Sequence, residues 1–253
     1  MNNEAHDVID LSEITRENWA DLMWRINNLY WCINKDGKEF LFKLNWAQEK
    51  LLQNLWYNDL VLKVRQIGMT TLFQVLGLDA CVFNPNFSTG FIAQDKENAK
   101  ELLRRNVLSP YKRLPGALRD NIGLKTENKF ELEWTNGSIY RSGVSLRSGT
   151  YQMLHISEFG KTCARFPAKA KEIVTGSLET VGKRNLKIIE STAEGYSGLF
   201  YDYCQDGIER LEAGKEPNEL QYKFFFFPWY EEPTYVLDPA GVVISAQLLS
   251  LIH

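Results

Sequence analysis

The stretch LVLKVRQIGMTTLF, residues 60–73, decides the fold predicted for this chain. An apolar strand runs into a turn that contains Gly68, and Thr70 and Thr71 then open a helix. This order of strand, turn and helix N-terminus is typical of loops that bind the phosphates of a nucleoside triphosphate. The usual pattern has a lysine directly before the hydroxyl residue, and this chain has Met69 there.

Two cations at the start of the turn can replace the missing lysine. Lys63 stands five residues before Gly68, where the first glycine of the usual pattern lies, and Arg65 follows two residues later. A lysine carries its charge on a flexible four-carbon stem, and an arginine offers a fork that binds phosphate oxygens bidentately. We therefore expect Lys63 and Arg65 to bind phosphate. The alternative is that KVRQ is an ordinary solvated strand end.

Apolar strands alternate with helices along the rest of the chain. This alternation predicts an α/β fold with a mostly parallel central sheet and helices on both faces. Asn136-Gly137, between two alternating segments, adds a hairpin to that sheet. The expected strands are 60–64, 88–95, 151–157, 185–192 and 221–228, and the expected helices between them are 70–82, 96–108, 168–181 and 197–214.

The composition is that of an ordinary globular protein. Of the 253 residues, 44% are hydrophobic and 24% are charged, and the net charge is -3, so any contact with nucleic acid must come from local patches. No apolar run approaches the roughly 20 residues that a membrane-spanning helix needs. The four cysteines lack a C-x-x-C pair, which favours reduced structural thiols. The three histidines show no metal-binding pattern, and His155 is interpreted as a hydrogen-bonded core residue.

Two further strands end in residues that suit nucleotide hydrolysis. MLHISE ends with Glu158, a carboxylate that can polarise an attacking water molecule, or alternatively a plain exposed strand end. The acidic residue that usually precedes it is Ser157 in this chain, so a hydroxyl group stands where Mg²⁺ is commonly held through water. KIIESTAEG contains Ser191 and Thr192, hydroxyl residues that can sense a γ-phosphate.

Taken in chain order, these segments resemble the ATPase domain of tailed-bacteriophage large terminases, the motors that pump DNA into procapsids. The resemblance implies a P-loop NTPase fold of the additional-strand, RecA-like type, in which the lysine of the loop is allowed to shift to its start. The resembling segments are KVRQIGMTT (63–71), LHISEFGK (154–161), IIESTAEG (188–195), NWAQEKLL (45–52) as the adenine motif and FPWYEEPTY (227–235) as the exit from the ATPase core.

The resemblance also implies ATP and Mg²⁺ as cofactors, with roles for single residues. Glu158 would be the catalytic carboxylate, and Lys63 and Arg65 would bind phosphate. Thr70 would ligate Mg²⁺, with Ser157 in the place of the usual aspartate. The other implied contacts are Gln48 to the adenine edge (or else an exposed helix glutamine), Gln66, Ile67, Gly68, Met69, Thr70 and Thr71 to the phosphates, and Ser191 and Thr192 as the coupling motif.

Large terminases work as rings on DNA, which implies two further kinds of contact. Arg147 or Arg141 would enter a neighbour's site and stabilise transition-state charge, although a solvated loop arginine is the simpler interpretation of either. DNA would be held by its backbone phosphates. The interleaved Glu97 and Glu101 favour a salt-bridged solvent face as the alternative. The candidate cations are Lys96, Lys100, Arg104, Arg105, Lys112 and Arg113.

The implied organisation is a helical lead-in at 1–44, an ATPase core at 45–235 and, at 236–253, the start of a linker towards a nuclease domain. We expect no nuclease activity from this chain. The implied function is translocation of double-stranded DNA into a procapsid, with a portal protein, the small terminase subunit and further copies of the chain as partners. The implied location is the host bacterial cytoplasm, transiently at the portal, with no membrane contact. The alternatives are another helicase-like P-loop ATPase, and a non-catalytic nucleotide-binding or docking module, which Met69 and Ser157 favour.

Overall fold

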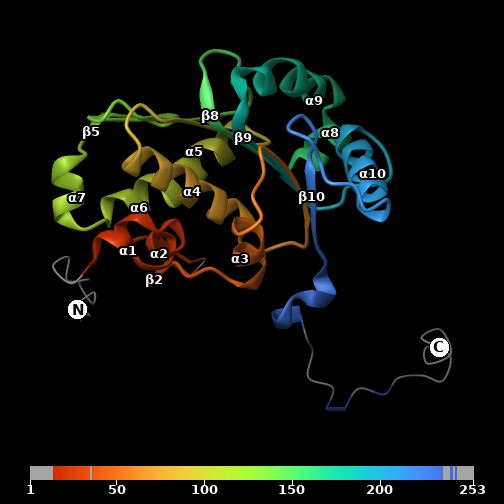
Figure 1. Ribbon diagram of the computed structural model, residues 1–253, viewed down its shortest axis with the longest axis horizontal. Coiled ribbons are helices and arrows are strands. Elements are labelled where there is room, and N and C mark those ends of the chain that lie inside the picture. Colours follow the sequence, from red (N-terminus) through yellow and green to blue (C-terminus); the bar gives the residue numbers. More distant parts are fainter. Residues whose placement is uncertain (1–13, 35, 236–239, 242, 244–253) are drawn as a thin grey trace.

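The computed structural model describes residues 14–34, 36–235, 240–241 and 243. Most of the predicted linker at 236–253 lies outside these residues. Within them, the centre of the molecule is an eight-stranded sheet with the strand order β10-β3-β9-β8-β4-β7-β6-β5 (Figure 1). Neighbouring strands are parallel from β10 to β7, and β6 and β5 add an antiparallel edge. The predicted α/β fold is therefore confirmed. The strands are β3 (Asn58–Lys63), β4 (Ser88–Ile92), β5 (Leu124–Glu127), β6 (Glu131–Trp134), β7 (Ile139–Gly143), β8 (Tyr151–Ser157), β9 (Val181–Ser191) and β10 (Lys223–Phe227).

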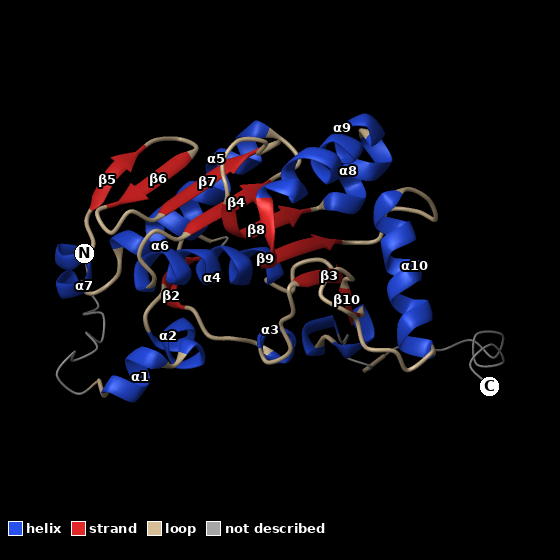
Figure 2. Ribbon diagram, turned by 45° about the horizontal axis from the view of Figure 1, so that its top comes forward, coloured by secondary structure: helices blue, strands red, loops and turns tan. Residues whose placement is uncertain are grey.

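Helices cover both faces of the sheet because successive strand residues point to opposite sides. Val61 and Ile188 pack into one core, while Leu60 and Ile189 pack into the other. The first core lies under α1 to α7, and the second under α8 to α10 (Figures 1 and 2). The helices are α1 (Arg16–Ala20), α2 (Leu22–Asn28), α3 (Trp46–Leu52), α4 (Met69–Phe83), α5 (Lys96–Leu103), α6 (Ser109–Lys112), α7 (Gly116–Asn121), α8 (Phe159–Arg165), α9 (Pro167–Glu172) and α10 (Leu199–Glu212), with π turns at Arg104–Leu108 and Ile173–Ser177 and 3-10 turns at Leu178–Thr180, Trp229–Glu231 and Pro233–Tyr235.

The N-terminal lead-in packs into the same core as α4, the helix that follows the predicted phosphate-binding loop. Arg25 of α2 forms a buried ion pair with Asp79 of α4, with 2.7 Å between Nη2 and Oδ2. Tyr30 donates its hydroxyl hydrogen to the same carboxylate, also at 2.7 Å. The lead-in continues into a small hairpin of β1 (Trp31–Ile33) and β2 (Glu39–Leu41). The described part of the lead-in thus shares its hydrophobic core with the segment that follows residue 44.

Several predicted boundaries were wrong. Strand β4 ends at Ile92 rather than at residue 95, and β9 begins at Val181, four residues earlier than expected. The helix expected at 96–108 changes from α to π geometry at Arg104. The hairpin at Asn136-Gly137 is confirmed, since it joins β6 to β7. No helix in the part of the chain that the structure describes is long and apolar enough to cross a membrane.

Candidate active site

The loop between β3 and α4 has the backbone of a phosphate-binding turn. Gln66 and Gly68 both lie in the left-handed region, with φ of 63° and 79°. Helix α4 begins at Met69 with Gly68 as its N-cap, and no side chain caps its first turn. The N–H groups of that turn therefore stay available to an anion, which the partial positive charge of the helix N-terminus also favours.

Gln48 supports this loop from behind. Its side chain is buried, Nε2 donates to the Gly68 carbonyl oxygen at 2.9 Å, and Oε1 accepts from the Asn45 backbone N–H at 3.0 Å. Asn45 in turn donates to the Ile67 carbonyl oxygen at 3.0 Å. The alternative of an exposed glutamine is therefore wrong. The predicted adenine contact stays a prediction, and each end of the amide already makes one hydrogen bond inside the protein.

Lys63, at the end of β3, lies between two carboxylates. Its Nζ is 3.2 Å from Glu158 Oε1 and 3.1 Å from Glu190 Oε2, and its side chain is only 6% exposed. Burial alone would lower the pKa of Lys63, but the charges of Glu190 and Glu158 outweigh burial and raise it. The lysine is therefore a permanent cation beside the loop.

Glu158 follows the last residue of β8 and precedes α8. Its backbone is left-handed, with φ of 53° and ψ of 42°, a conformation that is uncommon for a residue other than glycine and is often found at functional sites. Oε1 pairs with Lys63, and Oε2 accepts from the Thr192 hydroxyl at 3.4 Å. The structure therefore brings together the predicted catalytic carboxylate, the predicted phosphate cation and one residue of the predicted coupling motif.

Glu190 is a site residue that sequence reasoning missed. It lies near the end of β9, is fully buried, and its Oε1 accepts from the hydroxyl groups of Thr70 at 2.5 Å and Ser157 at 2.8 Å. His155 Nε2 lies 3.3 Å from the same oxygen. His155 is thus the buried, hydrogen-bonded residue that was expected, although its partner belongs to the site.

The buried Glu190 carboxyl group is ionised. Burial alone would raise the pKa of Glu190. The charge of Lys63 and the hydrogen bonds with His155 and Thr70 lower the pKa by more than burial raises it, so the pKa falls well below its usual range. One signal in the sequence could have found this residue. An acidic side chain directly after two isoleucines of a buried strand is rare unless it is paired.

The phosphate-loop segment, Lys63 and Glu158 border a cleft of about 680 Å³, a size suited to a small ligand. The cleft extends from the loop to the β1–β2 hairpin, where Phe40 lines it, and to the region of α5, where Leu102 lines it. The predicted site residues that line the cleft are Lys63, Gln66, Gly68, Met69, Thr70, Thr71, Ser157 and Glu158.

Other predicted site residues lie outside the lining of this cleft. Arg65 is exposed, and its carbonyl oxygen accepts from the Tyr235 hydroxyl at 2.5 Å. Ile67 is buried, as is Ser191. Arg147 is 58% exposed and pairs with Glu172 of α9 at 3.0 Å. A role for Arg147 in a neighbouring subunit stays a prediction.

Three of the six candidate DNA cations form ion pairs, as the salt-bridged alternative predicted. Lys100 pairs with Glu97 at 3.0 Å, and Lys112 pairs with Glu127 at 2.8 Å. Arg105 donates to the Ile33 carbonyl oxygen at 3.1 Å and lines the cleft. Arg113 pairs with Glu39. Arg141, the other arginine predicted to enter a neighbour's site, pairs with Glu131.

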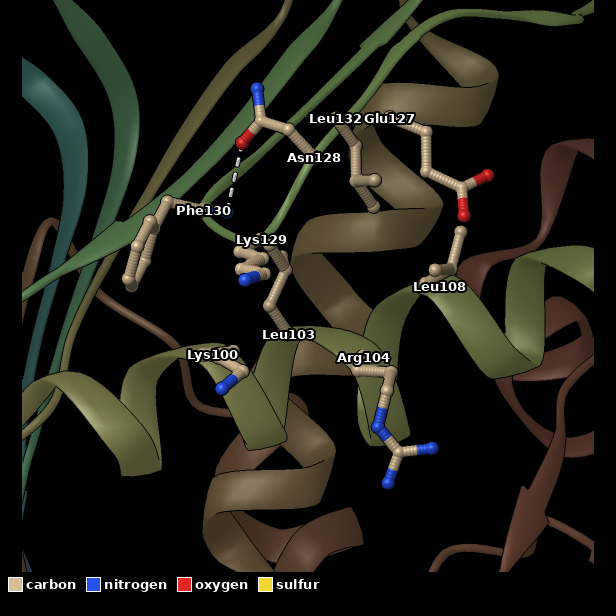
Figure 3. A pocket seen from close by; sticks show the side chains of 9 residues that line it. All are labelled: Lys100, Leu103, Arg104, Leu108, Glu127, Asn128, Lys129, Phe130 and Leu132. Atoms are coloured by element: carbon tan, nitrogen blue, oxygen red, sulfur yellow. Dashed lines mark hydrogen bonds between the residues drawn. The ribbon is translucent and has the colours of Figure 1, made fainter.

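A separate hollow of about 710 Å³ lies beside these cations. Figure 3 shows Lys100 and Arg104 on one side of it, and Lys129 and Phe130 on the other. Glu127 also lines it, so both signs of charge are present. The hollow is therefore a weaker candidate for a functional site than the cleft at the phosphate loop.

Comparison with known proteins decides the fold. No protein-family model and no curated protein matches this chain. The ATPase domain of the large terminase of Thermus phage P74-26 superimposes with a TM-score of 0.54 and 13% identity, covering 75% of this chain and 83% of that one. This chain has the fold of a large-terminase ATPase domain. The large terminase of bacteriophage HK97 superimposes with a TM-score of 0.59 and 16% identity, covering 79% of this chain and 42% of that one.

The residues at the cleft fit a nucleotide with Mg²⁺ better than they fit a metal held by protein alone. The described residues contain no group of three or more His, Cys, Asp or Glu side chains that could hold a metal ion. Nucleotide-bound Mg²⁺ needs only one or two protein oxygens, because phosphates and water supply the rest. Thr70 offers such an oxygen at the cleft, next to an ionised carboxylate.

Proposed function

We propose that this chain is the ATP-hydrolysing motor domain of a viral DNA-packaging terminase, which couples ATP hydrolysis to translocation of double-stranded DNA into a procapsid. The observation that carries the proposal is the meeting of Lys63 and Glu158, 3.2 Å apart, beside a phosphate-binding loop. The fold shared with two large terminases supports the motor role.

The loop and Lys63 would hold the phosphates of ATP. The backbone N–H groups at the start of α4 point to an anion site, and Gly68 allows a close approach. Lys63 would exchange its bond to Glu158 for bonds to phosphate oxygens, since its stem is flexible. Mg²⁺, when bound, would supply a further positive charge, and Thr70 Oγ1, which lines the cleft, would hold it.

Glu158 would orient the attacking water. When Lys63 turns to the phosphates, Glu158 Oε1 is left free to accept a hydrogen bond from a water molecule. The oxygen of that water forms a bond to the γ-phosphorus, the bond from the γ-phosphorus to the leaving oxygen of ADP breaks, and a proton of the water passes to the Glu158 carboxylate. Water on one side of Glu158 and Thr192 on the other would connect the nucleotide to the end of β9.

Ser191 and Thr192 would carry the change onward to α8. Gly160, in the first turn of α8, packs so closely that an added Cβ would lie 2.8 Å from Ser191 Oγ and 3.1 Å from the Thr192 carbonyl oxygen. A shift of the coupling motif would therefore move α8. Such a packed contact transmits displacement because protein interiors leave little free space.

The wider parts of the proposal concern assembly. Double-stranded DNA would be held by its backbone phosphates, and copies of the chain would form a ring at a portal protein with the small terminase subunit, in the host cytoplasm. Arg147 would leave Glu172 and stabilise transition-state charge in the next subunit. Its exposure on the surface supports this assignment.

The test of hydrolysis is phosphate release from ATP, with and without double-stranded DNA. Glu158→Gln keeps the size of the side chain and removes its charge, so we expect release to fall by about 10²- to 10⁴-fold while ATP binding is retained. Glu216→Gln, in an exposed segment, is the control and should match the parent chain. A parent chain that releases no phosphate under either condition, or a Glu158→Gln variant as active as the parent, would overturn the proposal.

A further inference from the structure

Positions 157 and 190 face each other on neighbouring strands. Ser157 of β8 and Glu190 of β9 are partners in the parallel register. Neighbouring strands lie about 4.8 Å apart, so the carboxylate of Glu190 can reach the side chain of Ser157 on the next strand. The chain thus has a serine at position 157, where an acidic residue is usual, and a buried glutamate at position 190 on the next strand.

The contacts of Glu190 show where its charge is delivered. Its Oε1 accepts from Thr70 Oγ1 at 2.5 Å and from Ser157 Oγ at 2.8 Å. Both hydroxyl residues line the cleft, whereas Glu190 itself is fully buried behind them. The carboxylate therefore reaches the cleft through two hydroxyl groups.

A hydroxyl group that donates its only hydrogen to a carboxylate has its lone pairs left for another partner. Glu190 draws the hydrogens of Thr70 and Ser157 inward, so both oxygens present lone pairs on the remaining side. Oxygen lone pairs are what Mg²⁺ and its bound waters bind. A carboxylate behind a metal ligand also fixes the ligand's orientation and strengthens it as a donor.

We infer that Glu190 is the carboxylate that positions Mg²⁺ at the nucleotide site, acting through Thr70 and with Ser157 as a hydroxyl spacer. This inference rests on the proposed function. Glu190 is a positioning residue, because it is buried behind the two hydroxyl groups and does not reach the ion itself. The negative charge expected at 157 is thereby relocated to the adjacent strand.

A competing role for Glu190 is to anchor Lys63, whose Nζ is 3.1 Å from Oε2. The two roles predict different effects of Mg²⁺ on ATP binding by a Glu190 variant. Lys63 would contact phosphate whether or not the metal is present, so loss of an anchor would weaken ATP binding equally with Mg²⁺ and with EDTA. Loss of a metal-positioning carboxylate would weaken binding only with Mg²⁺.

The experiment is calorimetric titration of the purified chain with ATP, in saturating Mg²⁺ and in EDTA. We expect Glu190→Gln to lower the gain in affinity from Mg²⁺ by about 10- to 100-fold, the usual effect of removing such a carboxylate. The double variant Ser157→Asp with Glu190→Gln, which returns the charge to position 157, should recover most of that gain. Glu179→Gln, an exposed change before β9, is the control.

The outcomes are distinct. A parent chain that binds no ATP with Mg²⁺ overturns the proposed function and the inference with it. A parent that binds, with Glu190→Gln keeping the full gain from Mg²⁺ or losing affinity equally in EDTA, overturns the inference alone. If circular dichroism shows that Glu190→Gln is unfolded, Ser157→Ala decides, because it removes one of the two hydroxyl groups and leaves Glu190 and Lys63 in place. A reduced gain from Mg²⁺ supports the inference, and a full gain contradicts it.

Discussion

At the scale of single residues, the site is a buried charge network at the ends of three parallel strands. Lys63 comes from β3, Glu158 from the end of β8 and Glu190 from β9, and the cation lies within 3.2 Å of both carboxylates. Buried charges are tolerated only when they are paired, so Lys63 and Glu190 require each other, whereas Glu158 is 28% exposed. The same pairing holds Lys63 beside the loop before any phosphate arrives.

The conformation of Gly68 and its contact with Gln48 leave little room for a side chain in the loop. Its φ of 79° favours glycine, and an added Cβ would lie 2.8 Å from Gln48 Nε2. Gly37 has a similar φ of 77°, but an added Cβ there meets nothing within 4 Å. We expect Gly37→Ala to cost about 1–2 kcal/mol in free energy of unfolding from backbone strain alone, and Gly68→Ala to cost more and also to weaken ATP binding.

Urea denaturation of both glycine variants, followed by ATP titration, checks this prediction. Gly37→Ala serves as the control because it carries the strain without the collision. Equal losses of stability in the two variants, with unchanged ATP affinity in Gly68→Ala, would show that the contact between Gln48 and the loop has no importance.

At the scale of elements, the long apolar strands, α4 and the β6–β7 hairpin were predictable, whereas several other short elements were not. Helix α8 was missed because it begins directly after β8, with only Glu158 between them and no side-chain cap to mark its start. Strand β5, LKTE, was missed because an exposed edge strand carries few apolar residues. The β1–β2 hairpin consists of two strands of three residues each, too short for a periodic pattern.

Strand β3 contains a buried carboxyl group whose titration should be visible in stability. Asp59 is fully buried and accepts from the Trp56 backbone N–H at 3.1 Å. Burial raises the pKa of Asp59 to about 8, against the lowering effects of the Trp56 bond and Lys223. The pKa in the unfolded chain is about 3.9, so the folded chain binds the extra proton between these values.

The sign of the effect follows from that difference. Because the folded state holds more protons than the unfolded state, the contribution of Asp59 to stability is largest below pH 4 and falls as pH rises towards 8, by at most about 1.4 kcal/mol per pH unit. Asp59→Asn should remove this decline. Urea denaturation of parent and variant at pH 5, 6.5 and 8 measures it, and parallel pH profiles would contradict it.

At the scale of the whole molecule, the strand order explains why the site could be predicted only in part. Most of the predicted residues lie at a strand end, directly after one, or in the first turn of a helix, so each carries a local signal in the sequence. They are Lys63, Thr70, Ser157, Glu158 and Thr192. Their meeting depends on β3, β9 and β8 being neighbours. That adjacency is a property of the fold, and it also placed Glu190 behind Thr70 and turned Gln48 towards the loop, which no local pattern indicated.

The lead-in has a place in the same picture. It carries the β1–β2 hairpin to the far side of the cleft, where Phe40 faces the region bounded by the phosphate loop and Glu158. The ion pair between Arg25 and Asp79 fixes the lead-in to α4, the helix whose N-terminus is the proposed anion site. The two sides of the cleft are thus joined through one helix.

We propose that Lys63, at the start of the loop, takes the role of the lysine that usually stands at the position of Met69. The most direct measurement is calorimetric titration of ATP with Mg²⁺ into the parent chain, Lys63→Ala and the exposed control Lys183→Ala. Loss of a charged hydrogen bond worth about 1.5–3 kcal/mol predicts a roughly 10- to 100-fold weaker affinity for Lys63→Ala and no change for the control. Equal binding by all three chains, or by none, would contradict the account.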